Sequence, residues 1–294
     1  MKPEQRPRFE ELAPQFKALY AEVKVSGLTR KFVSPLWSGY VPRLEEALLP
    51  APAFSFLRRC GNFLGCQGPW LEDGQNGASL RFLESNVEAR LLKDRLLDEP
   101  AGAPVLTALP YLSSYNSVHQ LFHLTRYSLR SGADPAESNR VVEWGGGYGN
   151  MARIWRRMRP SGLTYTIIDL PLVSCLQWLY LSSVFGEQAV HLIRGPGDEP
   201  RTGLINLLPV TFLERTRVEA DFFLSTWALS ECSAGAQEHV FERDWFSAKR
   251  LLLAYQPGHL YTPDTRALEE RARRSGASVE NLFAPPATGR YAFL

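Results

Sequence analysis

The sequence predicts an α/β protein, in which a mostly parallel sheet with helices on both faces follows a mainly helical N-terminal region. Three observations support this. From Asn139 onward, short apolar runs alternate with stretches of helical spacing, which is the pattern of strands joined by helices. Before the turn cluster Ser131–Pro135, apolar residues recur mainly at helical spacing. A cluster of glycines, Gly145–Gly149, follows the first predicted strand.

The composition is that of an ordinary globular protein. Of 294 residues, 45% are hydrophobic and 22% are charged, so the chain can bury a sizeable core. A formal net charge of +2 supports neither a nucleic-acid-coating role nor a polybasic membrane anchor. The longest apolar stretch, Leu170–Phe185, is shorter than the roughly 20 residues that a membrane span needs. We therefore expect binding to neither nucleic acid nor membrane.

The cysteines and the N-terminus indicate a soluble cytoplasmic protein. No two cysteines have C-x-x-C spacing, and no histidine stands at zinc-ligand spacing from them. We expect reduced, mostly buried thiols and no metal site. Met1–Gln15 is charged and has no apolar leader segment. The four cysteines are Cys60, Cys66, Cys175 and Cys232.

Residues 1–133 are expected to form the helical region, which would serve as a lid, a substrate-binding part or a dimerisation arm. Apolar residues at helical spacing cover Phe9–Val25, Ala78–Leu97 and Ser117–Leu129. Prolines and glycines interrupt residues 35–74, where we expect loops and short helices. If the chain forms a homodimer, these N-terminal helices are the expected interface. A second domain would cover residues 134–294.

In that second domain, strands and helices are expected to alternate. Strands are expected at Arg140–Trp144, Thr164–Asp169, Ala189–Arg194, Asp221–Leu229 and Arg250–Tyr255. Helices are expected at Met151–Met158, Pro171–Phe185, Gln237–Phe246 and Thr265–Ser275. Pro171 suits the first turn of its helix. Residues 278–294 could supply a terminal hairpin.

The glycine cluster has the features of a cofactor-binding loop. It lies between a predicted strand and a predicted helix, where the backbone must turn sharply and approach a ligand closely. The helix N-terminus behind it offers unpaired N–H groups and the positive end of a dipole. Asp169 ends the next strand, so its carboxylate would lie at the same sheet edge and accept both hydroxyls of a ribose.

Two kinds of cofactor fit this geometry. Gly147-x-Gly149-x-x-Ala152 matches a dinucleotide pattern, so NAD or FAD is one option. Glu143, however, is an acid at the end of the strand, where dinucleotide loops keep an apolar residue because a carboxylate would face the pyrophosphate. An acid there suits S-adenosyl-L-methionine, which carries an ammonium, a carboxylate and a sulfonium and no phosphate. We favour this cofactor over a dinucleotide, and a tight turn without a ligand is the remaining reading.

These residues resemble a known family. Glu143–Arg153 is similar to the first motif of class I S-adenosylmethionine-dependent methyltransferases. Ile168–Val173, Leu176–Ser182 and Ser225–Cys232 resemble the group named sugar O-methyltransferases. The resemblance implies a Rossmann-like domain with a mostly parallel seven-stranded sheet. It also implies cofactor contacts from ten residues: Glu143, Gly145, Gly147 and Gly149 at the methionine part, Asp169 at the ribose, Leu170, Asn206 and Leu207 near the adenine, and Ser225 and Thr226 near the methyl group.

Methyl transfer to a hydroxyl also calls for a general base, because an alcohol is a poor nucleophile at neutral pH. His119 and His123 are four residues apart on a predicted helix and share one face, so either could be the base. Glu231, just past the fourth strand, is the other candidate. The alternative is a pair of ordinary helix histidines, one packed and one exposed to solvent. Acceptor contacts are expected from four residues, Tyr111, Tyr115, Asn116 and Trp227.

The sequence therefore predicts methyl transfer from S-adenosylmethionine to a hydroxyl of a small metabolite. The resemblance suggests a sugar or a glycosylated product of natural-product biosynthesis as the acceptor. An N- or carboxyl-methyltransferase acting on a small molecule or a modified peptide is an alternative. A cofactor-binding scaffold without catalysis is another, as is a nicotinamide-dependent oxidoreductase, although Glu143 argues against the last.

Overall fold

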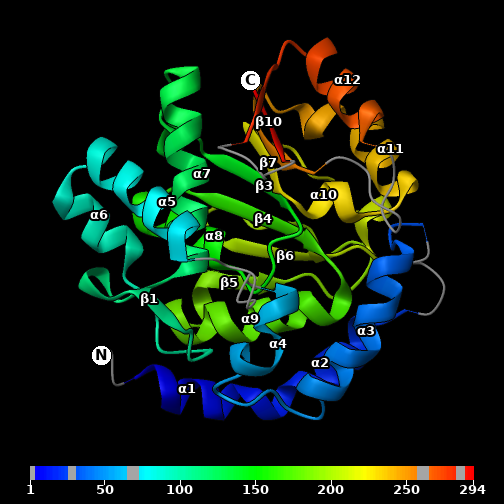
Figure 1. Cartoon of the computed structure of the whole chain (residues 1–294). Coiled ribbons are helices and arrows are strands. Elements are labelled where there is room, and N and C mark those ends of the chain that lie inside the picture. The colour runs from blue at the N-terminus through cyan, green and yellow to red at the C-terminus, as the bar shows by residue number, and fades with distance from the viewer. Residues whose placement is uncertain (1–3, 26–30, 65–72, 257–264, 283–288) are drawn as a thin grey trace.

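A computed structural model describes residues 4–25, 31–64, 73–256, 265–282 and 289–294. At its centre lies an eight-stranded sheet in the order β5-β6-β4-β3-β7-β8-β10-β9 (Figure 1). The strands are β3 (Arg140–Trp144), β4 (Thr164–Asp169), β5 (Val190–Leu192), β6 (Ile205–Pro209), β7 (Phe222–Thr226), β8 (Arg250–Tyr255), β9 (Ser278–Asn281) and β10 (Arg290–Phe293). All neighbouring strands pair in parallel except β10, which is antiparallel to both β8 and β9. This confirms the predicted α/β, Rossmann-like architecture.

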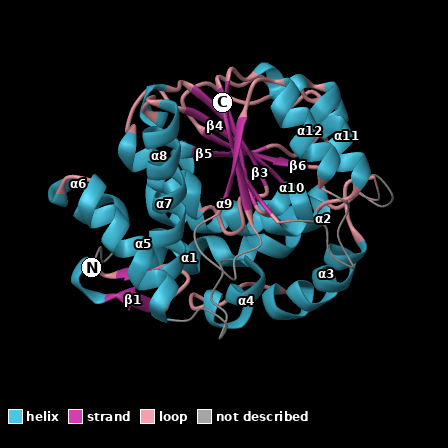
Figure 2. Cartoon of the chain, turned by 45° about the horizontal axis from the view of Figure 1, so that its top comes forward, coloured by secondary structure: helices cyan, strands magenta, loops and turns pink. Residues whose placement is uncertain are grey.

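The chain reverses its direction across the sheet between β3 and β7. From β3 it passes through α8 (Asn150–Met158) and α9 (Pro171–Phe185) toward the β5 edge, and from β7 it passes through α10 (Ala228–Glu231) and α11 (Ala234–Glu242) toward the other edge. Because parallel crossovers are right-handed, the two directions place their helices on opposite faces. Figure 2 shows helices on both sides of the twisted sheet. A crevice is expected at this reversal, at the carboxyl ends of the strands.

Helix α9 shows how the N-terminal helices complete the fold. Every residue from Pro171 to Val184 is buried, so the helix is covered all round. The sheet covers one side, and α1 (Gln5–Leu12) and α2 (Phe16–Val23) pack against the helix from outside. These helices share one continuous hydrophobic core with the sheet. The division of the chain at residue 133 stays a prediction.

The other N-terminal elements surround the same sheet. They are α3 (Pro35–Leu48), α4 (Leu57–Leu64), α5 (Asp73–Asn86), α6 (Ala89–Leu96), the short strands β1 (Leu106–Ala108) and β2 (Ser113–Ser114), and α7 (Tyr115–Ser131). The N-cap of α7 is Ser114, whose hydroxyl accepts from the Ser117 N–H, and its C-cap is Gly132 with φ of +71°. It packs against α5, α8 and β10. Among the described residues, no helix is long and apolar enough to cross a membrane.

Several predicted elements are confirmed, and others need correction. The strand Arg250–Tyr255 and the terminal hairpin, formed by β9 and β10, are as expected. The apolar stripe Ala78–Leu97 is two helices, α5 and α6, instead of one. Residues 35–48, expected to be loop or short helix, form one 14-residue helix that continues through Pro42.

The sheet has eight described strands where seven were expected, and the cause lies after β4. No strand was expected at Ile205–Pro209, but this segment is strand β6 and pairs directly with β4. The segment predicted as the third strand contains β5, which lies outside β6 at the sheet edge. All five residues of β6 are buried, as fits an inner parallel strand. An apolar run of this length is ambiguous from periodicity alone.

Candidate functional site

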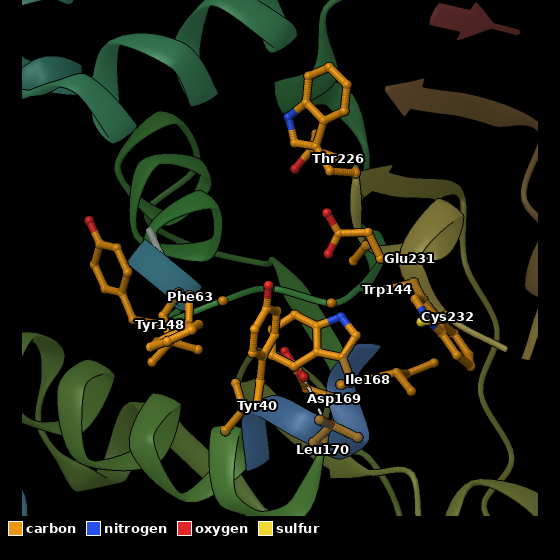
Figure 3. Close-up of a pocket in the computed structure, with 18 of the residues that line it drawn as sticks. Tyr40, Phe63, Trp144, Tyr148, Ile168, Asp169, Leu170, Thr226, Glu231 and Cys232 are labelled. Carbon is orange, nitrogen blue, oxygen red and sulfur yellow. Dashed lines mark hydrogen bonds between the residues drawn. The ribbon is translucent and has the colours of Figure 1, made fainter. Parts of the chain in front are cut away.

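A cavity of about 260 Å³ lies at the carboxyl ends of the parallel strands, where the strand order reverses. We call its lower wall the floor, which consists of the residues that follow four neighbouring strands. These are Gly145–Tyr148 after β3, Asp169 and Leu170 at the end of β4, Val210 after β6, and Thr226–Ala228 at the end of β7. The opposite wall, the roof, comes from helices α3, α4 and α7. Figure 3 shows Tyr40 and Phe63 of the roof and Asp169 of the floor around this cavity.

The glycine loop is bent as its sequence requires. Gly145, Gly147 and Gly149 have φ of +76°, +55° and +97°, a region that side chains rarely tolerate. A Cβ at Gly147 would lie 2.4 Å from the Leu64 carbonyl oxygen, and one at Gly145 would lie 2.1 Å from Ala228 Cβ. The loop is therefore held between α4 of the roof and α10. Gly145 and Gly147 line the cavity, whereas Gly149 is the N-cap of α8.

Glu143 lies against this loop, under Gly146, instead of lining the cavity. Glu143 is 1% exposed, and a Cβ at Gly146 would lie 3.0 Å from its Oε2. Tyr165 Oη donates a hydrogen bond to Glu143 Oε2 at 2.9 Å. Burial raises the pKa of Glu143 to about 8, against the opposing effect of this hydrogen bond. In the free protein at neutral pH, the group is therefore mainly protonated.

Asp169 lines the cavity and also ties the loop to α9. Its Oδ2 accepts from Gln177 Nε2 at 2.8 Å, and its Oδ1 accepts from the Leu170 N–H at 2.8 Å. The backbone N–H groups of Gly146 and Gly147 also donate to it. Burial raises the pKa of Asp169 to about 7, and these hydrogen bonds work against that rise. Gln177 donates in addition to the Gly147 carbonyl at 2.8 Å.

The two histidines on α7 occupy different surroundings. His119 lines the cavity, and its Nε2 accepts from Trp227 Nε1 at 3.3 Å. Because an indole N–H is only a donor, the His119 proton is on Nδ1 in this arrangement, and its lone pair is in use. Burial lowers the pKa of His119 to about 4. His123 is fully buried behind it, with Nδ1 2.5 Å from Tyr291 Oη, and does not line the cavity.

Trp227 directly follows β7 and Glu231 ends α10, and both line the cavity. Trp227 has φ of +75°, which is a strained backbone for a residue with a side chain. Glu231 accepts a hydrogen bond from Trp37 of the roof, and Gln256 Nε2 lies 3.4 Å from its Oε1. Burial raises the pKa of Glu231 to about 7. A carboxylate that titrates near neutral pH and lines a cavity is suited to general base catalysis.

The structure brings most of the predicted site residues to one place. Those that line the cavity are Gly145, Gly147, Asp169, Leu170, Thr226, Trp227, Asn116, His119 and Glu231. Those that do not are Glu143, Gly149, Asn206, Leu207, Ser225, Tyr111, Tyr115 and His123. Asn206 and Leu207 lie inside strand β6, and Val210 just after that strand reaches the cavity in their place. Ser225 Oγ donates to the Trp144 carbonyl and accepts from the Leu229 N–H. Tyr111 Oη donates to Glu84, and Tyr115 stacks on the ring of His119.

The aromatic side chains of the roof were not predicted. Trp37 and Tyr40 are on α3 and Phe63 is on α4, in the segment that was expected to be loops and short helices. Ser34 caps α3 and Pro35 occupies its first turn, so the Ser-Pro pair was a usable start signal. The internal Pro42 argues against a helix, so the helix was not predicted despite this start signal. Gln177 lies within the motif Leu176–Ser182, but its hydrogen bonds to Asp169 and Gly147 were not predicted, because they join distant segments.

The described cysteines, Cys60, Cys175 and Cys232, are free, and Cys66 lies outside the described residues. Cys232 Sγ accepts from Trp144 Nε1 at 3.1 Å in the cavity wall, and burial raises its pKa to about 12. The thiol is therefore neutral at physiological pH and is not an activated nucleophile. Within the part of the chain that the structure describes, no group of three or more His, Cys, Asp or Glu side chains is placed to hold a metal ion.

Comparisons with known proteins give distant similarities in structure. No protein-family model and no curated protein matches the chain. The mitomycin 7-O-methyltransferase MmcR is 17% identical, with 85% of this chain and 74% of that one covered, at a TM-score of 0.42. NcsB1, an O-methyltransferase from neocarzinostatin biosynthesis solved with S-adenosylmethionine, is 13% identical, with 75% and 68% covered, at 0.38. Human N-acetylserotonin methyltransferase, also solved with S-adenosylmethionine, is 14% identical, with 98% and 92% covered, at 0.38. The fold assignment rests on the strand order of this chain's own sheet.

Proposed function

We propose that this protein is an S-adenosylmethionine-dependent methyltransferase that methylates a hydroxyl of a small molecule. One observation carries the proposal: the bent glycine loop, the Asp169 carboxylate and the Glu231 carboxylate line a single cavity at the reversal of the sheet. An open α/β sheet binds its ligands at this place. When bound, S-adenosylmethionine supplies a methyl group on a positively charged sulfur.

The residues of the floor fit the parts of that cofactor. Asp169 would accept hydrogen bonds from the ribose hydroxyls, and the apolar side chains of Leu170, Val173 and Val210 would contact the adenine. The backbone of Gly145 and Gly147 would approach the methionine part, because no side chain intervenes there. Glu143 under the loop would favour a cation over a pyrophosphate, since it ionises more readily beside a positive charge.

We assign the general base to Glu231 in preference to the histidines. Its carboxylate lines the cavity, whereas the His119 lone pair is used by Trp227 and His123 is buried behind the cavity. Glu231 would accept the proton of the acceptor hydroxyl, and the roof would exclude water around it. His119 and Trp227 would then shape the wall of the acceptor site.

The finer parts of the assignment have separate support. A sugar or glycosylated natural product as acceptor rests only on the resemblance of the motifs at 168–182 and 225–232. Free cysteines at the described positions support a cytoplasmic location. A homodimer through the N-terminal helices, which would use the surface around the exposed Leu109 and Leu112, also stays a prediction.

Calorimetric titration with S-adenosylhomocysteine tests the cofactor assignment. The wild type should bind, and Asp169→Asn should bind at least about tenfold more weakly, because one charge-assisted hydrogen bond is worth about 1.5–3 kcal/mol. Asp94→Asn, on the exposed surface of α6, is the matched control and should bind like the wild type. Unchanged affinity in Asp169→Asn would contradict the assignment. Binding of NADH in place of S-adenosylhomocysteine would favour the dinucleotide alternative.

A further inference from the structure

Three aromatic side chains form a continuous wall in the roof of the cavity. The rings of Trp37 and Tyr40 are 5.7 Å apart at 90°, and those of Tyr40 and Phe63 are 4.8 Å apart at 54°. All three line the cavity and are only partly buried, so each has ring surface left for a further contact. In Figure 3 the Tyr40 hydroxyl is at the end of the ring that faces the side of the cavity where Glu231 lies. Such a wall is suited to stacking a flat ring.

The charged side chains among the described residues that line the cavity are all acidic. Two carboxyl groups, Asp169 and Glu231, line it, and the described lining residues include no lysine or arginine. The cofactor balances its own carboxylate with its ammonium, but an acceptor with a phosphate or carboxylate would enter without a cationic partner and would be repelled by these acids. The polar side chains that remain, such as Asn62, Asn116 and Gln120, are uncharged. The cavity thus selects against anionic acceptors.

The aromatic wall and the base are directly connected. Trp37 donates its indole hydrogen bond to Glu231, so the acid lies at the edge of the wall. A ring stacked on the wall would present a substituent to this carboxylate. A phenol is a much better partner than a sugar hydroxyl, because it loses its proton near pH 10, as tyrosine does, whereas an aliphatic hydroxyl resembles water at about 16.

We propose that Trp37, Tyr40 and Phe63 form the acceptor subsite, and that the acceptor is a planar aromatic compound that presents a phenolic hydroxyl to Glu231 and carries no phosphate or carboxylate. This deepens the proposed function and rests on it. The phenol oxygen forms a bond to the methyl carbon, while the carbon–sulfur bond breaks and its electron pair stays on the sulfur. The phenolic proton passes to the Glu231 carboxylate and is later released to water.

Binding of three probes to the protein saturated with S-adenosylhomocysteine tests the proposal. The probes are 2-naphthol, 2-naphthoate and methyl glucoside, which differ in ring and charge, and tryptophan fluorescence or calorimetry gives each Kd. We expect 2-naphthol to bind at least about tenfold more tightly than 2-naphthoate, which has the same ring and a negative charge. Methyl glucoside, without a flat ring, should bind more weakly than 2-naphthol by a similar factor.

Variants locate the subsite. Phe63→Leu should weaken 2-naphthol binding about tenfold and leave the Kd of S-adenosylhomocysteine within about twofold. Phe82→Leu is the matched control, because Phe82 packs on Phe122 with rings 4.9 Å apart and is not part of the cavity wall. It should change neither constant. If Phe63→Leu does not fold, Tyr40→Leu tests the same wall with the same expected result.

Three outcomes would overturn the proposal. The first is tighter binding of 2-naphthoate or methyl glucoside than of 2-naphthol. The second is equal weakening of 2-naphthol and S-adenosylhomocysteine in Phe63→Leu, which would assign the wall to the cofactor. The third is binding of S-adenosylhomocysteine without any binding of 2-naphthol, which would leave the proposed function standing. Failure of the wild type to bind S-adenosylhomocysteine would instead refute the proposed function itself.

Discussion

Replacing Glu143 by Gln is expected to stabilise the free protein at alkaline pH. Burial raises the pKa of Glu143 from 4.5 to about 8. A carboxyl with a raised pKa holds its proton more tightly in the folded chain than in the unfolded chain. The folded chain therefore loses stability as the pH rises from 4.5 toward 8, because the unfolded chain can ionise and the buried group cannot. Gln has nearly the same shape and no charge, so it removes this loss.

The size of the effect follows from the same pKa. Each pH unit between the two pKa values costs the folded state about 1.4 kcal/mol, so this group lowers the free energy of unfolding by roughly 4 kcal/mol between pH 5 and pH 8. At about 2.1 cal/mol/K per residue, 294 residues give an entropy of unfolding of about 0.6 kcal/mol/K. The expected gain in Tm of Glu143→Gln over the wild type is therefore roughly 6 °C larger at pH 8 than at pH 5.

Differential scanning calorimetry of both proteins from pH 5 to pH 8.5, at constant ionic strength, measures this difference. Burial also raises the pKa of Asp169 and of Glu231, so the wild-type curve alone contains their contributions. The difference between variant and wild type isolates Glu143. Glu88→Gln, at an exposed position before α6, is the control and should follow the wild type at every pH. The same gain at pH 5 and pH 8 would refute the reasoning, since it would mean that the buried carboxyl does not hold its proton.

Two further predictions concern the base and the glycine loop. Glu231→Gln should lower kcat for methylation of 2-naphthol by about 10²–10⁴-fold. The wild-type rate should rise with pH through about 7, because only the ionised carboxylate accepts a proton. If the rate of both proteins rises with pH in the same way, Glu231 is not the base. Gly147→Ala and Gly132→Ala both place a side chain at positive φ, but only the first meets another atom, the Leu64 carbonyl oxygen. Urea denaturation should show that Gly132→Ala lowers the free energy of unfolding by about 1 kcal/mol and that Gly147→Ala lowers it clearly more. Equal losses would mean that α4 does not contact the loop closely.

Features that depend on neighbouring residues could be predicted from the amino-acid sequence. The alternation of strands and helices after Asn139, the turn at Gly145–Gly149 and the position of Asp169 at the end of its strand all follow from local periodicity and backbone chemistry. Parallel strands bring their carboxyl ends to one edge, so the cavity floor was predictable as well. The terminal hairpin was predictable for the same local reason.

The contacts between distant segments could not be predicted in this way, because they depend on how the whole chain packs. Ile205–Pro209 is an inner strand because it pairs with β4. Its short apolar run does not by itself distinguish a strand from another buried segment. Trp37 and Glu231 are far apart in the chain, and their contact comes from the packing of α3 over the sheet edge. The hydrogen bond from Trp227 likewise occupies the lone pair of His119, and the glycine loop packs over Glu143. The periodicity of apolar residues indicates which face of a helix or strand is buried. Which other element packs against that face depends on the whole fold.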